Sequence, residues 1–149
     1  MPRLVLIHAL MAGSLLATGC GGGSNDLAGS DAQAVAVLRI TGPEYGSYLA
    51  ANNGQPPKDA AAFRKFLEAR LDQFAAYNVK SVDDLLKSPR DGQPLVIITG
   101  KKVSAPDQAD FPWAAYEQTG ANGKRMAVNV RGGVVDLTPE EFAQYVPIQ

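Results

Sequence analysis

The chain has 149 residues, 46% of them hydrophobic, and its 14 basic and 15 acidic side chains give a net charge of −1 at pH 7. This near balance does not suit the phosphate backbone of nucleic acid, which we therefore exclude as a partner. The only cysteine is Cys20, and the only histidine is His8, which lies in a segment that we expect to be removed. Nucleophile systems that need His or Cys, and the usual zinc, copper and iron ligand sets, are thereby excluded, so we expect neither an enzyme nor a cofactor.

Residues 1–19 have the layout of an export signal. Arg3 precedes an apolar run from Leu4 to Leu16, and small residues follow the run. The sequence LATGC, which ends at Cys20, resembles the lipobox of bacterial lipoproteins. The resemblance implies cleavage before Cys20 and attachment of lipid to its thiol. Acyl chains on Cys20 would hold the protein in a lipid bilayer of the cell envelope, facing the periplasm or the exterior.

Two other interpretations of this segment stay open. An uncleaved membrane-spanning helix is the first, although the apolar run of about 13 residues is shorter than the roughly 18 that a spanning helix needs. Ordinary secretion is the second, because Ala17, Thr18 and Gly19 also suit a small-residue cleavage site.

Residues 20–30 follow as the lipidated cysteine and a tether. The stretch GGGSNDLAGS at 21–30 is rich in Gly and Ser and has almost no apolar content, which predicts a flexible coil. The length of the remainder, residues 31–149, predicts a single globular domain.

The first half of this domain has the pattern of helices. Residues 31–53 carry apolar side chains at helical spacing with an interruption at Gly42-Pro43, although β-branched residues at 35–41 are equally consistent with a strand. Residues 59–76 form an amphipathic pattern with Asp59 as its cap and an apolar stripe from Phe63 to Phe74. A second short helix is predicted to begin at Ser81, whose hydroxyl would cap it.

The second half has the pattern of strands. The β-branched run 95–99 predicts a central strand covered on both faces, and the runs 113–119, 124–130 and 133–137 are separated by Gly-rich turns. Along 124–130 the apolar side chains fall on one face, while Arg125 and Asn129 fall on the other, which predicts one packed face and one wet face. We expect the Phe63 to Phe74 stripe to cover the packed face.

The sequence TPEE that starts at Thr138 predicts a capping box at the start of a short C-terminal helix. Its structural role accounts for Glu140 and Glu141, which favour the positive end of a helix. The predicted fold class is therefore α+β, with N-terminal helices packed on a small antiparallel β-meander and a short helix at the C-terminal end.

Two stretches carry a resemblance to a known family. They are SPRDGQP at 88–94, which precedes an apolar strand, and the tail from Tyr116 through GGVVDLTPEEF at 132–142. These resemble uncharacterised exported bacterial proteins with a globular domain related to the pseudopilins of type II secretion, over about residues 45–146. The resemblance implies a pilin-head-like fold. Arg131 departs from the family, which usually has Asp there, and cleavage at Cys20 would remove the apolar helix that a pseudopilin keeps.

Three functional hypotheses from different classes follow. The leading one is a noncatalytic envelope lipoprotein whose globular head docks another envelope or secretion component. The second is a small extracytoplasmic binding module for carbohydrate, peptide or calcium. The third is a hydrolase that uses carboxylates, although ordinary helix capping explains every close carboxylate pair.

The candidate binding surface lies on the predicted wet side of the sheet. Trp113 and Tyr116 together with Phe111 would form a platform for stacking on a sugar, and Lys101 and Arg131 would supply positive charge. In the calcium variant of this hypothesis, Asp107 and Asp110 would supply oxygen ligands from a polar loop.

Overall fold

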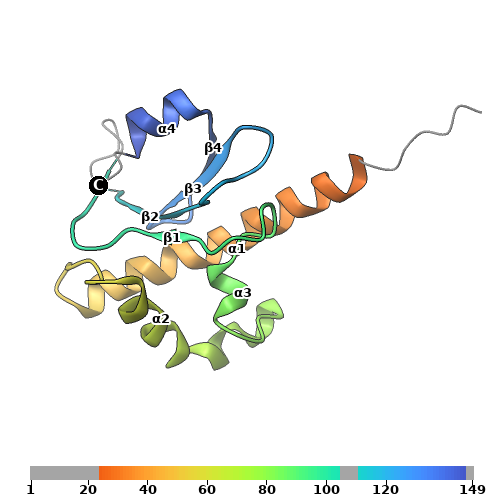
Figure 1. Cartoon of the computed structure of the whole chain (residues 1–149). Helices are drawn as coiled ribbons and strands as arrows, with labels where there is room; N and C mark the ends of the chain where they lie inside the picture. The colour runs from red at the N-terminus through yellow and green to blue at the C-terminus, as the bar shows by residue number, and fades with distance from the viewer. Residues whose placement is uncertain (1–23, 105–110, 147–149) are drawn as a thin grey trace, which may run out of the picture.

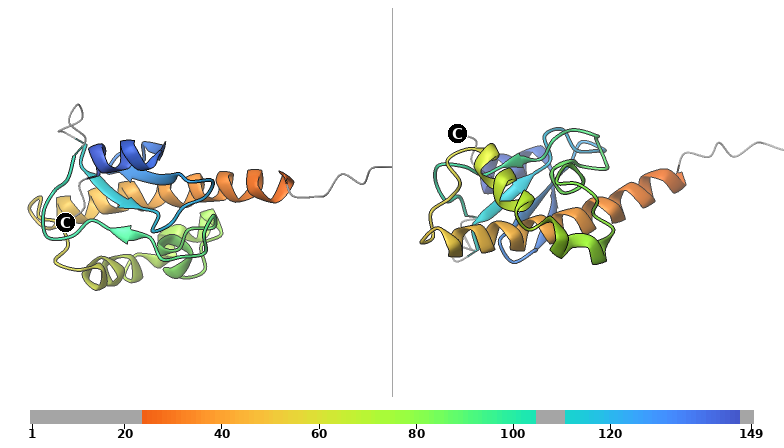
Figure 2. Two further views of the ribbon diagram at one scale, coloured as in Figure 1. Left: turned by 45° about the horizontal axis from the view of Figure 1, so that its top comes forward. Right: turned by 90° about the horizontal axis from the view of Figure 1, so that it is seen from below.

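A computed structural model describes residues 24–104 and 111–146 (Figure 1). One long helix, α1, occupies the middle of the molecule, with the sheet and α4 on one side and α2, η1 and α3 on the other (Figures 1 and 2). The N-terminal turns of α1 project beyond both layers. The elements are α1 (Ser24–Ala51), α2 (Ala60–Glu68), the 3-10 helix η1 (Leu71–Tyr77), α3 (Asp83–Leu86), β1 (Val96–Ile97), β2 (Trp113–Tyr116), β3 (Arg125–Asn129), β4 (Val134–Leu137) and α4 (Pro139–Tyr145). The α+β class predicted from the sequence is confirmed.

The start of α1 corrects the predicted tether. The coil expected over 21–30 is wrong from Ser24 onward, because residues 24–30 form the first turns of α1. The composition of this stretch is unfavourable for a free helix. Helices are cooperative, however, and a long helix packed further along its length propagates at little cost beyond its packed part.

The middle of α1 decides an open alternative and corrects a prediction. Residues 35–41, for which helix and strand were both open, are helical, and the helix continues through Gly42 and Pro43 without the predicted break. A proline inside a helix costs about 3 kcal/mol. Burial offsets this cost, because Leu38, Tyr45 and Leu49 lie on one stripe of α1 in the core.

Two glycines let α1 approach the sheet very closely. A Cβ atom on Gly42 would lie 2.3 Å from the backbone oxygen of Asn129, and a Cβ atom on Gly46 would lie 3.0 Å from that of Val130. Real Cβ atoms do not tolerate the first distance. Gly42 and Gly46, one helical turn apart, therefore form the contact with β3 and the turn that follows it.

The predicted helix over 59–76 divides into two elements. Asp59 caps α2 as predicted, with its carboxylate accepting from the amide of Ala62 at 2.7 Å. The chain then turns at Arg70 and continues as the 3-10 helix η1, which ends at Asn78 in a left-handed conformation. The buried residues Phe63 and Phe74 therefore belong to separate elements.

The start of α3 differs from the prediction at Ser81. No hydroxyl caps the helix there. Instead the carboxylate of Asp84 accepts hydrogen bonds from the amides of Lys80 and Ser81 at 2.8 and 2.9 Å.

The sheet is an antiparallel meander in the order β1-β2-β3-β4, as the turn spacing predicts. The position of β1 is a correction. The run 95–99 was predicted to be a central strand, whereas the strand is limited to Val96–Ile97 and lies at an edge of the sheet. The apolar composition of this run predicted its burial correctly, since Leu95, Ile97 and Ile98 are buried. Apolar composition does not, however, distinguish an edge strand covered by a helix from a central strand.

Both faces of the sheet are covered, so the predicted wet face is wrong. Helix α4 lies over the face that holds Arg125, whose guanidinium sits 4.9 Å from the Phe142 ring. Asn129 is buried on the sheet as well. The capping box at Thr138 that starts α4 is confirmed. The opposite face packs on α1 rather than on the Phe63 to Phe74 stripe.

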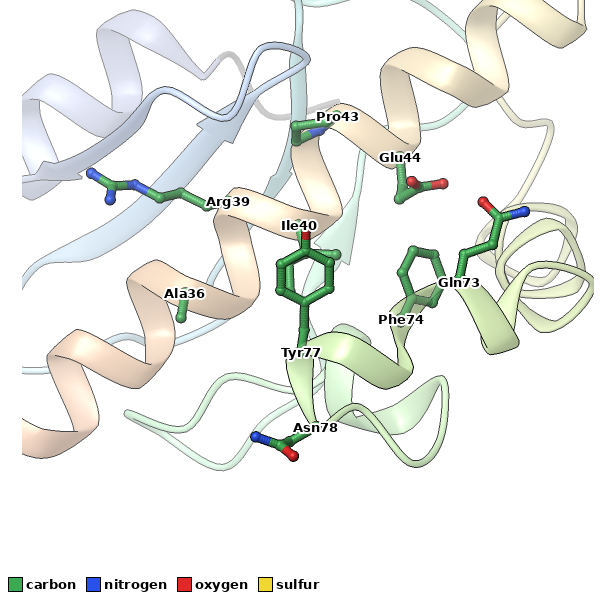
Figure 3. A pocket seen from close by; sticks show the side chains of 9 residues that line it. All are labelled: Ala36, Arg39, Ile40, Pro43, Glu44, Gln73, Phe74, Tyr77 and Asn78. Carbon is green, nitrogen blue, oxygen red and sulfur yellow. The ribbon is translucent and has the colours of Figure 1, made fainter.

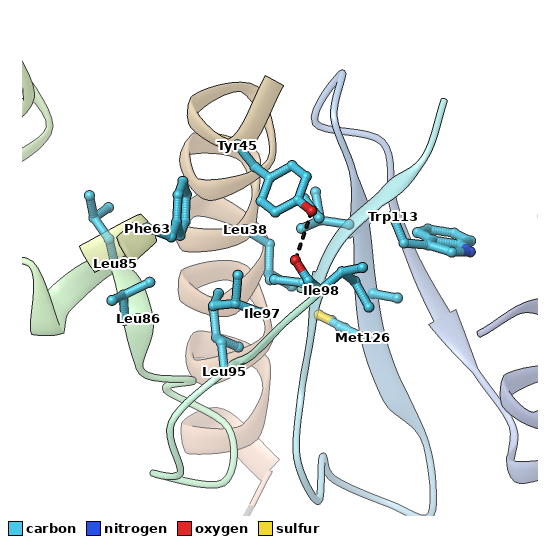
Figure 4. Close-up of a cluster of buried hydrophobic side chains, with 14 of the residues drawn as sticks. Leu38, Tyr45, Phe63, Leu85, Leu86, Leu95, Ile97, Ile98, Trp113 and Met126 are labelled. Atoms are coloured by element: carbon cyan, nitrogen blue, oxygen red, sulfur yellow. Dashed lines mark hydrogen bonds between the residues drawn. The ribbon is translucent and has the colours of Figure 1, made fainter. Parts of the chain in front are cut away.

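The core lies between α1 and its neighbours on both sides (Figure 4). Tyr45 is its central residue. Its ring packs edge-on against Phe63 of α2 at 5.5 Å, and its hydroxyl donates to the backbone oxygen of Ile98 at 2.7 Å. Burial of this hydroxyl raises the pKa of Tyr45 well above its usual value. One side chain thus joins three layers of the domain.

Candidate functional site

The predicted aromatic platform does not form. Trp113 is only 4% exposed, and its indole N–H donates to the backbone oxygen of Tyr145 in α4 at 2.8 Å. Tyr116 is half-buried under the same helix, with its ring 5.0 Å from Phe142. Burial raises the pKa of the Tyr116 hydroxyl. Both rings hold α4 on the sheet, so they are not available for stacking on a sugar.

The predicted basic residues stay exposed but do not converge with these rings. Arg131 lies in the turn after β3, where its guanidinium stacks 4.2 Å from the Phe111 ring. Lys101 lies in the loop after β1. Cys20, Asp107 and Asp110 lie outside the described residues, so the lipid attachment and calcium predictions are not addressed by the structure.

An apolar groove lies between α1 and η1 (Figure 3). Its volume is about 670 Å³. Ile40 and Pro43 of α1 form one wall, and Phe74 and Tyr77 of η1 form the other. A second cavity of about 530 Å³ continues it along α1 toward α3, because both are lined by Ala36, Ile40, Tyr77 and Asn78. Together these form what we call the α1–η1 groove.

Tyr77 distinguishes this groove from an ordinary packing defect. Its side chain is 64% exposed, and it is one of two large hydrophobic residues that stand exposed in the described part of the chain. At one end of the groove, Glu44 accepts from Nε of Arg70 at 2.9 Å, which fixes η1 against α1. The groove is therefore closed at one end by an ion pair between α1 and Arg70 and bordered by an aromatic side chain in solvent.

A cluster of polar side chains, separate from the groove, surrounds Arg90 in the SPRDGQP segment. Its side chain is 1% exposed, and three carboxylates approach it: Asp31 of α1 at 3.2 Å, Asp136 of β4 at 3.1 Å, and the fully buried Glu117 at 3.4 Å. A second terminal nitrogen, Nη2, donates to the backbone oxygen of Ala121 at 3.1 Å. We call these residues the Arg90 cluster.

Glu117 and Asp91 complete the neighbourhood of Arg90. The Glu117 carboxylate accepts from the Ser88 hydroxyl at 2.6 Å and from the Met126 amide at 2.8 Å. Asp91 accepts from the amides of Gln93, Thr119 and Gly120. Burial acts to raise the pKa of Asp91, but these backbone hydrogen bonds outweigh it and lower the pKa.

The Arg90 cluster has the chemistry of a structural clamp. Its three carboxylates share one guanidinium, and none of them lines either of the two cavities described above. Within the described ranges, no three His, Cys, Asp or Glu side chains are placed to hold a metal ion. No helix in those ranges has the length and apolar content of a membrane-spanning segment.

Sequence reasoning missed both features, although each left a signal. For the Arg90 cluster the signal was Glu117, a charged residue directly after the apolar stretch 113–116, which requires a partner if it is buried. For the groove the signal was weaker. Tyr77 ends a helical pattern in which Phe74 already supplies the buried aromatic residue. The Tyr77 ring is therefore not needed for packing of the core.

Comparison with known proteins adds no assignment, since no family model, curated protein or solved structure matches the chain.

Proposed function

We propose that this protein is a noncatalytic lipoprotein, anchored in the cell envelope through Cys20, whose folded domain docks another envelope protein in the α1–η1 groove. The lipobox-like sequence LATGC supports the anchor. The exposed Tyr77 ring beside an apolar groove supports the docking role, and it is the observation that carries the proposal.

A protein partner fits this groove better than a small molecule does. Sites for small molecules bury most of the ligand and converge several polar groups on it. Here Ile40, Pro43, Phe74 and Tyr77 form the facing walls. The polar side chains of the lining are Arg39, Glu44, Gln73 and Asn78, and of these Glu44 is already bonded to Arg70. Tyrosine is enriched at the centres of protein interfaces because it combines a large apolar ring with a polar tip.

The position of α1 relates the anchor to the groove. Ser24 begins α1, four residues after Cys20, and the same helix supplies one wall of the groove at Ile40. An α-helix rises about 1.5 Å per residue, so Ile40 lies roughly 24 Å along the axis from Ser24. The groove would therefore stand at a set height above the start of the helix.

The anchor is tested by labelling cells that express the full chain with an alkyne-bearing fatty acid. We expect a labelled band of the size of the processed protein, and no label in Cys20→Ala. A Cys20→Ala variant that carries the same label would contradict the anchor.

Docking is tested in the same cells with a photoreactive phenylalanine analogue in place of Tyr77. The matched control places it at Lys65, an exposed residue of α2 that does not line the groove. We expect a discrete adduct with an envelope protein from position 77, lost when Ile40→Asp places a charge in the wall. Equal adducts from both positions, or an adduct that survives Ile40→Asp, would contradict docking in the groove.

A further inference from the structure

The outer edge of β4 carries hydrogen-bonding groups that the sheet does not use. In the register of β3 and β4, the Asn129 amide donates to Gly133 O at 3.1 Å, which makes that facing pair a hydrogen-bonded one. Such pairs alternate along an antiparallel ladder, so Val135 and Leu137 also turn their amides and carbonyls toward β3. Val134 and Asp136 consequently direct theirs away from the sheet.

This edge lacks several of the usual protections against pairing. Natural edge strands are blunted by short length, by charged side chains (lysine above all), by proline, by a bulge or by a covering element, and of these β4 has its length of four residues and the charge of Asp136. β4 contains no lysine or proline, and its pairing with β3 is regular over all four residues. Val135 is 38% exposed, so an apolar side chain stands at this edge as well. Asp136 is the only charged residue of the strand.

The charge around Asp136 is not balanced. One guanidinium, that of Arg90, faces the three carboxylates of Asp31, Glu117 and Asp136. Asp31 Oδ1 and Arg90 Nε are both buried and lie 3.2 Å apart, yet neither has a hydrogen bond within the described part of the chain. The side chains of Asp31 and Asp136 are still 44% and 39% exposed. The cluster beside β4 therefore has excess negative charge that a second cation can reach.

We propose that the β4 edge is a docking site for an extended segment of a partner protein, which adds to the sheet as a fifth strand and places a Lys or Arg opposite Asp136. The backbone groups of Val134 and Asp136 would supply the hydrogen bonds. A basic residue opposite Asp136 forms a favourable cross-strand pair, and an apolar residue opposite Val135 covers its side chain. This site goes beyond the proposed function, since it stands whether or not the α1–η1 groove binds a protein.

A second copy of the chain is a poorer occupant. Pairing β4 with its own copy brings two Arg90 clusters of the same excess charge to one seam, and like charges across strands are destabilising. A partner strand that carries a lysine removes this excess. Charge complementarity therefore selects a basic segment from another protein.

The test titrates the full, anchored chain in detergent with a blocked seven-residue peptide that alternates valine and threonine around a central lysine. Amide hydrogen exchange is followed by NMR. We expect added peptide to slow exchange at Val134 and Asp136, and not at Val135 and Leu137, whose amides already face β3. Equal slowing at all four residues, or none, would overturn strand addition.

Two matched peptides separate backbone pairing from charge. N-methylation of one alternate set of peptide amides should weaken binding by about tenfold or more, whereas N-methylation of the other set should not, because only one set faces β4. Replacing the central lysine by glutamate should weaken binding by about fivefold at low salt, and Asp136→Asn should abolish that difference. Equal binding of both N-methylated peptides, or no preference for lysine, would overturn the proposal. Sedimentation that shows the chain pairing with itself through β4 would overturn the choice of occupant.

Discussion

The two faces of α1 differ in how completely they are packed. Toward the sheet, Gly42 and Gly46 bring the helix backbone against β3, and Tyr45 is fully buried. Toward η1, the same helix leaves a groove of about 670 Å³ with Tyr77 in solvent. On the sheet side, glycines without side chains allow the helix backbone to contact the sheet directly. On the η1 side, apolar side chains of α1 and η1 stay partly uncovered in the folded domain. The comparison suggests that the sheet side of α1 holds the fold and that the η1 side is available for binding.

The Arg90 cluster gives the largest expected effect on the sheet side. Arg90→Leu leaves the fully buried carboxylate of Glu117 without its cation, so we expect a loss of about 3–5 kcal/mol in the free energy of unfolding, measured with urea. The matched change on the other side of α1 is Arg64→Leu. Its partner Asp83 is 70% exposed and Arg64 itself is 42% exposed, so solvent screens the pair and the loss there should stay below about 1 kcal/mol.

A double variant checks the physical reason for the Arg90 effect. Adding Glu117→Gln to Arg90→Leu removes the unpaired buried charge and should recover about 1–2 kcal/mol. If the double variant is less stable than Arg90→Leu alone, the unpaired charge is not the cause of the loss.

The close approach of α1 to β3 gives the next effect. Gly42→Ala forces a Cβ atom against the oxygen of Asn129, and we expect a loss of about 1–3 kcal/mol. Gly29→Ala is the control in the same helix, since nothing lies within 4 Å of its added carbon. It should gain about 0.5–1 kcal/mol from helix propensity. Equal effects of the two substitutions in thermal unfolding would show that the helix does not contact β3 in this way.

The pKa of Asp91 predicts a dependence of stability on pH. Its pKa is lowered in the folded state, so the charged carboxylate stabilises the fold above the unfolded pKa of about 3.9. This contribution is lost as the pH falls through the lower, folded pKa. Asp91→Asn should therefore cost on the order of 1 kcal/mol at pH 7, and the difference from the parent should vanish at the acidic end of a urea unfolding series. A difference that is constant with pH would contradict this role.

The sequence predicted correctly those features of the fold that depend on residues adjacent in the chain. The Asp59 cap, the Thr138 capping box and the meander turns were correct because each depends on a few adjacent residues. Predictions that depended on distant partners were wrong. Gly42-Pro43 looked like a break because its cost is offset by burial of α1 against elements that lie far away in the sequence. Trp113 looked available because α4, which covers it, lies some thirty residues later.

The candidate sites were harder to predict for the same reason. Arg90 gathers carboxylates from α1, from the residue after β2 and from β4, and no spacing along the chain brings these together. The α1–η1 groove exists because the helical pattern over 59–76 divides at Arg70, where a side chain binds Glu44 of α1. The sequence pattern alone continues smoothly through that point.

Tyr77→Ala is expected to have the smallest effect on stability and tests the central claim most directly. The measurement compares its thermal unfolding with its capture of the envelope partner by a photoreactive group placed at Gln73, another residue of the groove. Because Tyr77 is mostly in solvent, we expect the free energy of unfolding to change by less than about 0.5 kcal/mol while capture of the partner is lost. A variant that unfolds more easily by about 2 kcal/mol or more but captures the partner as well as the parent does would contradict the account.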